Sequence, residues 1–475
     1  MTDDKISQIL TSLPCSIELP AGTGKTELIG RLVERHALNG NRSLVLTHTH
    51  AGVDVIRRRL KRFGVPVQAV TVRTIDSWSF DLISKMPQLS GISVGDEPDW
   101  KLSQAYHNAA RRAVQTPAIV RMLRASYNLL LVDEYQDCQL WQHELIAAFS
   151  ATVPTCVLGD RMQGLFFFGT AQPVDWDSEV LPHFPGMPID IQAWRWKGRN
   201  EELGEWLLGA RSALLDGEKL DLEGAPVRLR PRSDGLAPFH ESPRHPATTV
   251  AISRWPSDAA LLARRLGGSF TMIEEIEGKH LRAFAEVVDS GDSSYIAAGT
   301  VQFAIDCAFG LAGVFSLKDR TSLSAGRPIS SPEESEISLA VQATNGLLRD
   351  STPAAVRLAL VVIGRLPTFR LYRREAWFGV LEALRLCEAT DDLSALDAVI
   401  SVRTRMSRIG RRPESRIVGR PLLIKGLEFE HAVLENPAGY NAHELYVVLS
   451  RASTSLTIVT DTSSFAATRP IRVEG

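Results

Sequence analysis

Short apolar runs alternate with segments of helical spacing along the first third of the chain. The runs cover residues 15–19, 43–47, 67–72, 128–132 and 155–158. Between them apolar residues recur every three or four positions, as in the segment from Gly52 to Phe63, which is typical of amphipathic helices. Strands that are apolar throughout and separated by helices predict a parallel sheet covered by helices on both faces.

The pattern changes after residue 172. A Pro-rich segment at 173–188 predicts a linker, followed by a short strand at 189–192 and a helix at 200–215. Strand–helix units return at 249–268 and beyond 415, and the stretch between them is mainly helical. We therefore predict an α/β fold with two cores. The first is 1–172, with a short helical insertion at about 81–127; the second is 188–268 plus 415–475, interrupted by a mainly helical insertion at 269–414.

The composition is that of a soluble globular protein. Of 475 residues, 44% are hydrophobic and 23% are charged, and a formal net charge of −2 gives no general attraction to nucleic acid or membrane. Five scattered cysteines without a CxxC pair argue against a zinc site and favour a reducing compartment. The first residues show no apolar leader, and the apolar stretch 297–317 contains Gln302 and Asp306, which favours a buried helix over a membrane span. We expect a cytoplasmic protein with no membrane partner.

Residues 19–26 read LPAGTGKT and predict a phosphate-binding loop. Glycines let backbone N–H groups cradle phosphate oxygens, Lys25 can reach the β- and γ-phosphates, and the Thr26 hydroxyl can hold Mg²⁺. The helical pattern that follows would place the phosphates at a helix N-terminus. Leu19 stands where the strict pattern has a glycine. The nucleotide-binding residues predicted here are Ala21, Gly22, Thr23, Gly24, Lys25 and Thr26.

Two carboxylates follow the apolar run at 128–132, in the sequence NLLLVDEYQD. The carboxyl ends of parallel strands are where α/β sheets bind ligands. In a phosphate-loop enzyme the first carboxylate, here Asp133, helps to hold Mg²⁺, and the second, here Glu134, can accept a proton from the attacking water. The loop and the carboxylates together predict ATP and Mg²⁺ as cofactors.

Seven segments besides the phosphate loop carry a common signature. In chain order they are THTHAGVDVIRRRL, VRTIDSWSF, DEYQD, LGDRMQGLFFF, AWRW, IKGLEFEHAV and ELYVVLSRAS. Their content and order resemble the superfamily 1 DNA helicases of the UvrD/Rep type over about two-thirds of the chain. The resemblance implies two RecA-like cores of the P-loop NTPase fold, with ATP bound between them and with reduced helical insertions.

The resemblance also implies roles at single positions. Gln163 would orient water or sense the γ-phosphate, Arg195 and Arg451 would be arginine fingers, and Glu428 would approach the nucleotide ribose. Guanidinium groups suit the finger role because they stabilise charge on the transferring phosphoryl group. The segment around Arg195 departs from the family pattern NYRS, so Arg199 stays open as the alternative finger. The catalytic residues expected are Glu134, Gln163, Arg195 and Arg451.

The family tracks single-stranded DNA in the 3′ to 5′ direction. The nucleic-acid contacts implied are His48, Thr49, His50, Asp76, Trp78, Phe166 and Phe168. Aromatic faces bind any base, which suits the two phenylalanines, although core packing is the alternative for them. A separate basic segment at 403–420 holds seven arginines against one acid. It has three interpretations: phosphate binding, docking of an acidic partner, or a solvated helix end.

The compact plan also resembles the helicase-like subunit of the Gabija anti-phage system, in which the motor pairs with a separate nuclease of the overcoming-lysogenization-defect (OLD) type. We therefore expect an ATP hydrolase that translocates on or unwinds single-stranded or tailed DNA, in DNA repair or anti-phage defence. The alternative is a nucleotide- or DNA-sensing ATPase switch that regulates a partner nuclease without processive unwinding. The choice between DNA and RNA stays open.

Overall fold

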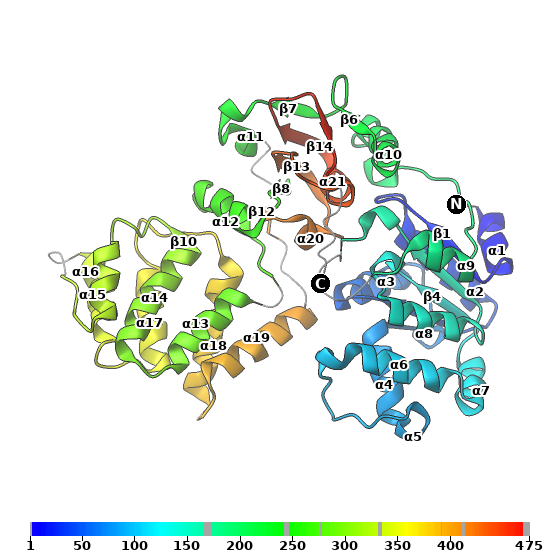
Figure 1. The fold of residues 1–475 in the computed structure, drawn as a ribbon, viewed down its shortest axis with the longest axis horizontal. Helices are drawn as coiled ribbons and strands as arrows, with labels where there is room; N and C mark the ends of the chain where they lie inside the picture. The colour runs from blue at the N-terminus through cyan, green and yellow to red at the C-terminus, as the bar shows by residue number, and fades with distance from the viewer. Residues whose placement is uncertain are drawn as a thin grey trace. The chain divides into compact units, whose positions relative to one another are not determined.

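The computed structural model describes residues 2–165, 173–241, 247–275, 278–330, 335–390, 392–409 and 414–468, without the side chains of 407–409. The chain divides into two compact units (Figure 1). Unit 1 comprises Met1–Val227, Pro437–Ser455 and Thr462–Gly475, and unit 2 comprises Arg228–Asn436 and Leu456–Asp461.

Unit 1 is built on a five-stranded sheet in the order β1-β5-β4-β2-β3, with all neighbours parallel. Its strands are β1 (Cys15–Glu18), β2 (Ser43–Thr47), β3 (Val70–Thr74), β4 (Leu129–Val132) and β5 (Thr155–Gly159). Each apolar run of the sequence therefore becomes a strand. Strand β3 begins later than predicted because Val67–Ala69 form a 3₁₀ turn after Pro66.

Both faces of this sheet are buried, as apolar runs without alternation require. In β4, Leu130 and Val132 join one hydrophobic core, while Leu129 and Leu131 join the core on the other face. The first core is completed by helices α4 (Ile75–Lys85), α6 (Ser103–Val114), α7 (Pro117–Ser126) and α8 (Leu140–Ser150). The second is completed by α1 (Asp3–Thr11), α2 (Lys25–Leu38) and α3 (His50–Arg62).

The rest of unit 1 comprises short elements and two further helices. The helices are α10 (Glu201–Leu215) and α21 (Ala442–Leu449), and the smaller elements are α5 (Pro87–Ser90), α9 (Leu181–His183), and the antiparallel pair β6 (Lys219–Asp221) and β15 (Ser464–Ala466). The strand predicted at 189–192 is wrong. Ile189 packs on a core but Ile191 is 44% exposed, so this segment has too little apolar burial to form a strand.

A second sheet has the order β7-β14-β13-β8-β12-β9, and its described pairings are parallel. The strands are β7 (Arg228–Arg230), β8 (Thr249–Ile252), β9 (Thr271–Met272), β12 (Arg416–Gly419), β13 (Phe429–Glu435) and β14 (Ala452–Val459). Ala251, Val418 and Val433 pack with α12 (Pro256–Arg265) and with Phe239 of α11 (Ala237–His240). The predicted fold class, two parallel α/β sheets, is thus confirmed.

The chain between β9 and β12 forms a mainly helical group, coloured green to orange in Figure 1. It contains α13 (Lys279–Asp289), α14 (Ser293–Cys307), α15 (Leu317–Ser324), α16 (Glu336–Gly346), α17 (Pro353–Ile363), α18 (Arg374–Ala389) and α19 (Ala395–Ile409), with a small pair β10 (Ala308–Phe309) and β11 (Arg370–Leu371). The apolar stretch 297–317 forms the predicted buried helix only as far as Cys307, where α14 ends and β10 begins; beyond it Leu311 and Phe315 are still buried in the core. Within the described part of the chain, no helix has the length and apolar character needed to cross a bilayer.

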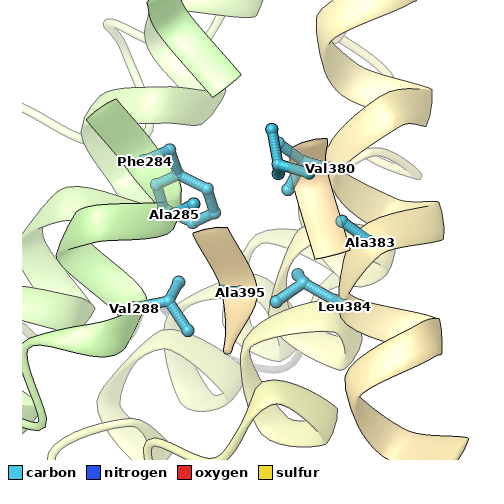
Figure 2. A pocket seen from close by; sticks show the side chains of 8 residues that line it. Phe284, Ala285, Val288, Val380, Ala383, Leu384 and Ala395 are labelled. Carbon is cyan, nitrogen blue, oxygen red and sulfur yellow. The ribbon is translucent and has the colours of Figure 1, made fainter. Parts of the chain in front are cut away.

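A small cavity of about 10 Å³ lies inside this helical group. Figure 2 shows Phe284, Ala285 and Val288 from α13 opposite Val380, Ala383 and Leu384 from α18. The lining is wholly apolar, and a space of this size is at the lower limit for one water molecule. The cavity is therefore a packing defect and not a ligand site.

Candidate nucleotide-binding site

The phosphate loop connects β1 to α2, and two glycines give it its shape. Gly22 has φ of 74° and Gly24 has φ of 97°, in the left-handed region that glycine adopts without strain. Thr23 Oγ1 donates to the Pro20 carbonyl at 2.7 Å, which closes the turn. Leu19, at the position where the strict pattern has glycine, is 1% exposed and packs in the core beside α2. That departure from the pattern is therefore a core residue at the foot of the loop.

Lys25 opens α2 and points at the carboxylates that follow β4. Its Nζ lies 2.6 Å from Glu134 Oε1 and 3.5 Å from Asp133 Oδ1. Burial by itself would lower the pKa of Lys25, but the two carboxylates outweigh it and hold the pKa above its usual range. Lys25 is thus a buried cation whose charge is balanced by the two carboxylates predicted from the sequence.

Glu134 has a backbone that non-glycine residues seldom adopt. Its φ of 56° and ψ of 40° are left-handed, which costs about 1–2 kcal/mol, and such strain concentrates at functional sites. The turn lets β4 end with Asp133 and Glu134 both directed at Lys25. Gln136 Nε2 then donates to Glu134 Oε2 at 2.5 Å, which fixes the second carboxylate oxygen.

Asp133 fits a magnesium ligand. It is 5% exposed, and its buried Oδ1 accepts no hydrogen bond from the residues that the structure describes, although it lies near Lys25. Burial raises the pKa of Asp133 to about 6, against the lowering effect of Lys25. Mg²⁺ prefers oxygen ligands and keeps several waters, and Thr26 stands next to Lys25 at the start of α2. A buried carboxylate that accepts no described hydrogen bond at Oδ1, together with the hydroxyl that follows Lys25 in the chain, supplies the type of oxygen donor that such an ion requires.

Asp160, which follows β5, links the phosphate loop to Gln163. Its side chain is fully buried. Asp160 Oδ2 accepts from the Ala21 backbone N–H at 3.1 Å and from Gln163 Nε2 at 2.9 Å. The Ala21 N–H also lies 2.7 Å from the hydroxyl of Tyr446 on α21. Gln163 is therefore held against the start of the phosphate loop through a single carboxylate.

Four residues of this site were not predicted from the sequence. Asp160 and Gln136 lie inside recognised segments, and an acid or amide beside a predicted site residue is the signal that could have found them. Tyr446 likewise lies inside a recognised segment, whereas Arg211 lies on a helix whose spacing indicates only packing, so no local signal marks Arg211. Arg211 is recognised only from its tertiary contacts.

The segment carrying Arg195 lies directly on the phosphate loop within unit 1. The Arg195 backbone N–H donates to the Gly22 carbonyl at 3.0 Å. A Cβ added at Gly22 would stand 2.7 Å from the Trp196 ring and 2.8 Å from Arg195 Cβ. Arg199 instead donates to Ser453 Oγ at 2.9 Å. Of the two alternative fingers, Arg195 is the one whose backbone contacts the loop.

Arg451 follows α21 and is 1% exposed. Its Nε donates to the Val447 carbonyl and its Nη2 to Ser450 Oγ, each at 2.8 Å. Arg195 Nη1 donates to the Ser450 carbonyl at 2.5 Å. Both predicted fingers therefore meet at one residue, Ser450, in unit 1.

Glu428 and the basic segment belong to unit 2. Glu428 is exposed just before β13, and its predicted ribose contact stays a prediction. In the basic segment, Arg403 contacts the Glu275 carbonyl and Arg420 the Glu275 carboxylate, while Arg405 lies 3.8 Å from Glu382. These described arginines are matched by acids or a carbonyl of the same unit, which weakens the phosphate-binding interpretation.

The residues predicted to contact nucleic acid differ in their exposure and in their side-chain contacts. Thr49 and His50 are exposed at the start of α3, where Thr49 Oγ1 accepts from the Gly52 N–H at 3.0 Å. His48 Nε2 lies 3.4 Å from Cys138 Sγ. Asp76 is half-buried and lies 3.0 Å from His107 Nε2. Burial alone would raise the pKa of Asp76, but His107, His48 and a hydrogen bond from Gln142 together outweigh it and lower the pKa.

Trp78 is the exception among these contacts. It is 6% exposed and stacks on Phe149 with ring centroids 5.0 Å apart, because its position on α4 faces the core. Its indole is therefore largely covered in this structure, and its nucleic-acid contact stays a prediction. Phe166 and Phe168 lie outside the described residues.

Comparison with known proteins supports a nucleotide-binding domain in this part of the chain. Residues 3–169 match the family model of an AAA domain. The match spans all five strands of the first sheet, the phosphate loop and the two carboxylates. A search of curated proteins finds no match.

Among solved structures, the chain is similar to an arterivirus nonstructural protein 10, a helicase solved in complex with DNA. The identity is 13% and the TM-score is 0.31, with 96% of this chain and 63% of that chain covered. This chain thus spans less than two-thirds of that helicase chain. At this TM-score the likeness is too coarse to support a function.

Proposed function

We propose that this protein is an ATP-dependent translocase or helicase of the UvrD/Rep type that moves along single-stranded DNA in the 3′ to 5′ direction. The observation that carries the nucleotide part is Lys25, 2.6 Å from Glu134 and 3.5 Å from Asp133 at the mouth of a glycine loop. Cation, metal-binding carboxylate and candidate base meet there as nucleotide hydrolysis requires.

The roles proposed follow from the chemistry of each group. Lys25 and the loop amides bind the phosphates, and Thr26 and Asp133 hold Mg²⁺, which neutralises charge on the phosphates. Glu134 takes the proton of the attacking water, and Gln163 orients that water. Arg195 and Arg451 stabilise the charge that develops on the γ-phosphate. We keep the predicted division into two cores and a helical insertion as part of this proposal.

The nucleic-acid part rests on the resemblance of the ordered segments and on His48, Thr49 and His50 at the carboxyl end of β2. The biological setting proposed is DNA repair or anti-phage defence, with an OLD-type nuclease as the partner in the second case. A switch that regulates such a nuclease without unwinding is the competing function. The switch function is favoured by the small size of the helical region between β3 and β4, which holds only the helices α4 to α7.

The first test is ATP hydrolysis by the purified chain, with and without single-stranded DNA, beside Glu134→Gln. We expect DNA to stimulate turnover, and we expect Glu134→Gln to bind ATP but lose turnover by about 10³-fold or more, because the base is gone while the metal site stays. Lys25→Ala is the matched variant that should lose nucleotide binding itself. Full turnover by Glu134→Gln would contradict the assignment of the base.

The second test separates the motor from the switch. A 3′-tailed and a 5′-tailed duplex are each incubated with the protein and ATP, with Glu134→Gln as the control. Displacement from the 3′-tailed substrate alone supports the motor and its direction. No displacement, together with nucleotide-dependent stimulation of an added nuclease, would refute the motor and support the switch.

A further inference from the structure

Asp160 is a fully buried carboxylate that several groups approach at once. Besides the Ala21 and Gln163 contacts, its Oδ1 accepts from the Met162 backbone N–H at 3.2 Å. A charge taken out of water is costly unless a counter-charge and hydrogen bonds replace its hydration. The backbone N–H groups of Ala21 and Met162 and the side-chain amide of Gln163 supply hydrogen bonds to Asp160 but no positive charge.

Arg211 supplies that charge from α10. Its Nε and Nη2 lie 3.2 and 3.0 Å from Asp160 Oδ1, and Nη2 also contacts Glu18 Oε1. The guanidinium lies 5.8 Å over the ring of Tyr446. Burial alone would lower the pKa of Arg211, but Asp160 and Glu18 outweigh it and raise the pKa. Arg211 is thus a fixed cation enclosed by two acids and an aromatic ring.

We propose that Arg211 is a positioning residue for nucleotide hydrolysis, which holds Asp160 in place so that Asp160 fixes the side chain of Gln163. The inference rests on the proposed ATPase function and adds a residue from a helix outside every recognised segment. Ala21 keeps a second acceptor in the Tyr446 hydroxyl, so the phosphate loop depends less on Arg211 than Gln163 does. Loss of Arg211 should therefore affect turnover and γ-phosphate sensing more than binding of the diphosphate.

The test is a double-mutant cycle with Arg211→Lys and Gln163→Ala. Lysine keeps the charge that a buried carboxylate needs, and so favours folding, but it cannot donate through two nitrogens held in a planar fork. We expect Arg211→Lys to lower kcat about tenfold and to change ADP affinity less than about threefold. In the Gln163→Ala background, Arg211→Lys should lower kcat by less than about twofold, because the effects of residues that act as a unit are not additive.

The matched control is Arg161→Met. Arg161 also contacts Glu18, at 3.0 Å, but its other partner is the exposed Asp177 and it has no described contact with Asp160. We expect its kcat to stay within about twofold of the parent chain. The positioning role is refuted if the fold-losses in kcat caused by Arg211→Lys and by Gln163→Ala multiply fully in the double variant. It is also refuted if Arg161→Met lowers kcat as much as Arg211→Lys does.

A second readout does not need turnover. The ratio of the affinities for ATPγS and ADP measures γ-phosphate sensing directly. We expect Arg211→Lys and Gln163→Ala to lower this ratio by the same factor, and the double variant to lower it no further. Absence of hydrolysis by the parent chain would overturn the proposed function, whereas an unchanged ratio in Arg211→Lys would overturn the role of Arg211.

Discussion

Replacing Gly22 by alanine tests the contact between the phosphate loop and the segment that carries Arg195. The new Cβ would meet the Trp196 ring at 2.7 Å and Arg195 Cβ at 2.8 Å, distances that Cβ atoms essentially never show. Trp196 has little room to retreat, since it is 1% exposed and its Nε1 donates to the Ala452 carbonyl at 2.7 Å. The loop or the tryptophan must therefore move.

The expected loss of stability has two parts. Alanine at φ of 74° costs about 1–2 kcal/mol on backbone grounds, and overpacking a closed site costs about 1–3 kcal/mol more. Gly40 separates the two parts, because its φ is also 74° and a Cβ there meets nothing within 4 Å. We expect Gly40→Ala to lose only the backbone part, so the two variants should differ by about 1–3 kcal/mol.

The assay is urea unfolding of both variants and the parent chain, followed by tryptophan fluorescence and by circular dichroism. Coincident transitions would allow free energies to be compared. Nucleotide affinity is measured in parallel, because a displaced loop should also bind ATP more weakly in Gly22→Ala than in Gly40→Ala. Equal losses of stability in the two variants would show that the Trp196 contact gives way freely, and would refute the reasoning.

Two further predictions concern stability. Burial and nearby His183 lower the pKa of His143 to about 4, against about 6.5 for an unfolded histidine. Between these two pH values the unfolded chain binds more protons than the folded chain, so acidification should destabilise the fold. The free energy of unfolding should fall by roughly 2–3 kcal/mol by the lower end of this range. His143→Gln should flatten this part of the stability–pH curve in urea melts at pH 4 to 7; an unchanged slope would disprove the assignment. In the helical group, Gly310 has φ of 94° and an added Cβ would lie 1.9 Å from the Thr368 carbonyl oxygen, so Gly310→Ala should lose about 3 kcal/mol or more. The control Gly313→Ala, which meets no neighbour, should melt like the parent chain, and similar melting of both variants would count against the clash.

The strands and the phosphate loop were predictable because their signals are local. A run such as Leu129–Val132 is apolar at every position, and only a strand buried on both faces accommodates it. The loop is marked by glycines at the positions where φ is positive. Leu19 stands where the strict pattern has glycine, but it does not alter the loop, because its side chain packs in the core.

The wrong strand prediction and the burial of Trp78 have physical reasons as well. The segment at 189–192 has a strand-like composition, but a strand also needs apolar burial, and Ile191 has little. Trp78 lies in a segment that resembles a nucleic-acid contact, yet the turn of α4 directs it to Phe149. Whether a side chain faces the core or the solvent depends on the helix that carries it and on what packs against that helix.

By itself the sequence determined the two-sheet α/β class and marked Lys25, Asp133 and Glu134 as candidates for one site, because apolar periodicity and glycine-rich turns act through near neighbours in the chain. Only the tertiary structure decided that Asp160 holds Gln163 and that Arg211 balances Asp160. A buried charge is stable only beside a counter-charge. Here that counter-charge comes from a different helix, 51 residues along the chain, and no local pattern records the pairing.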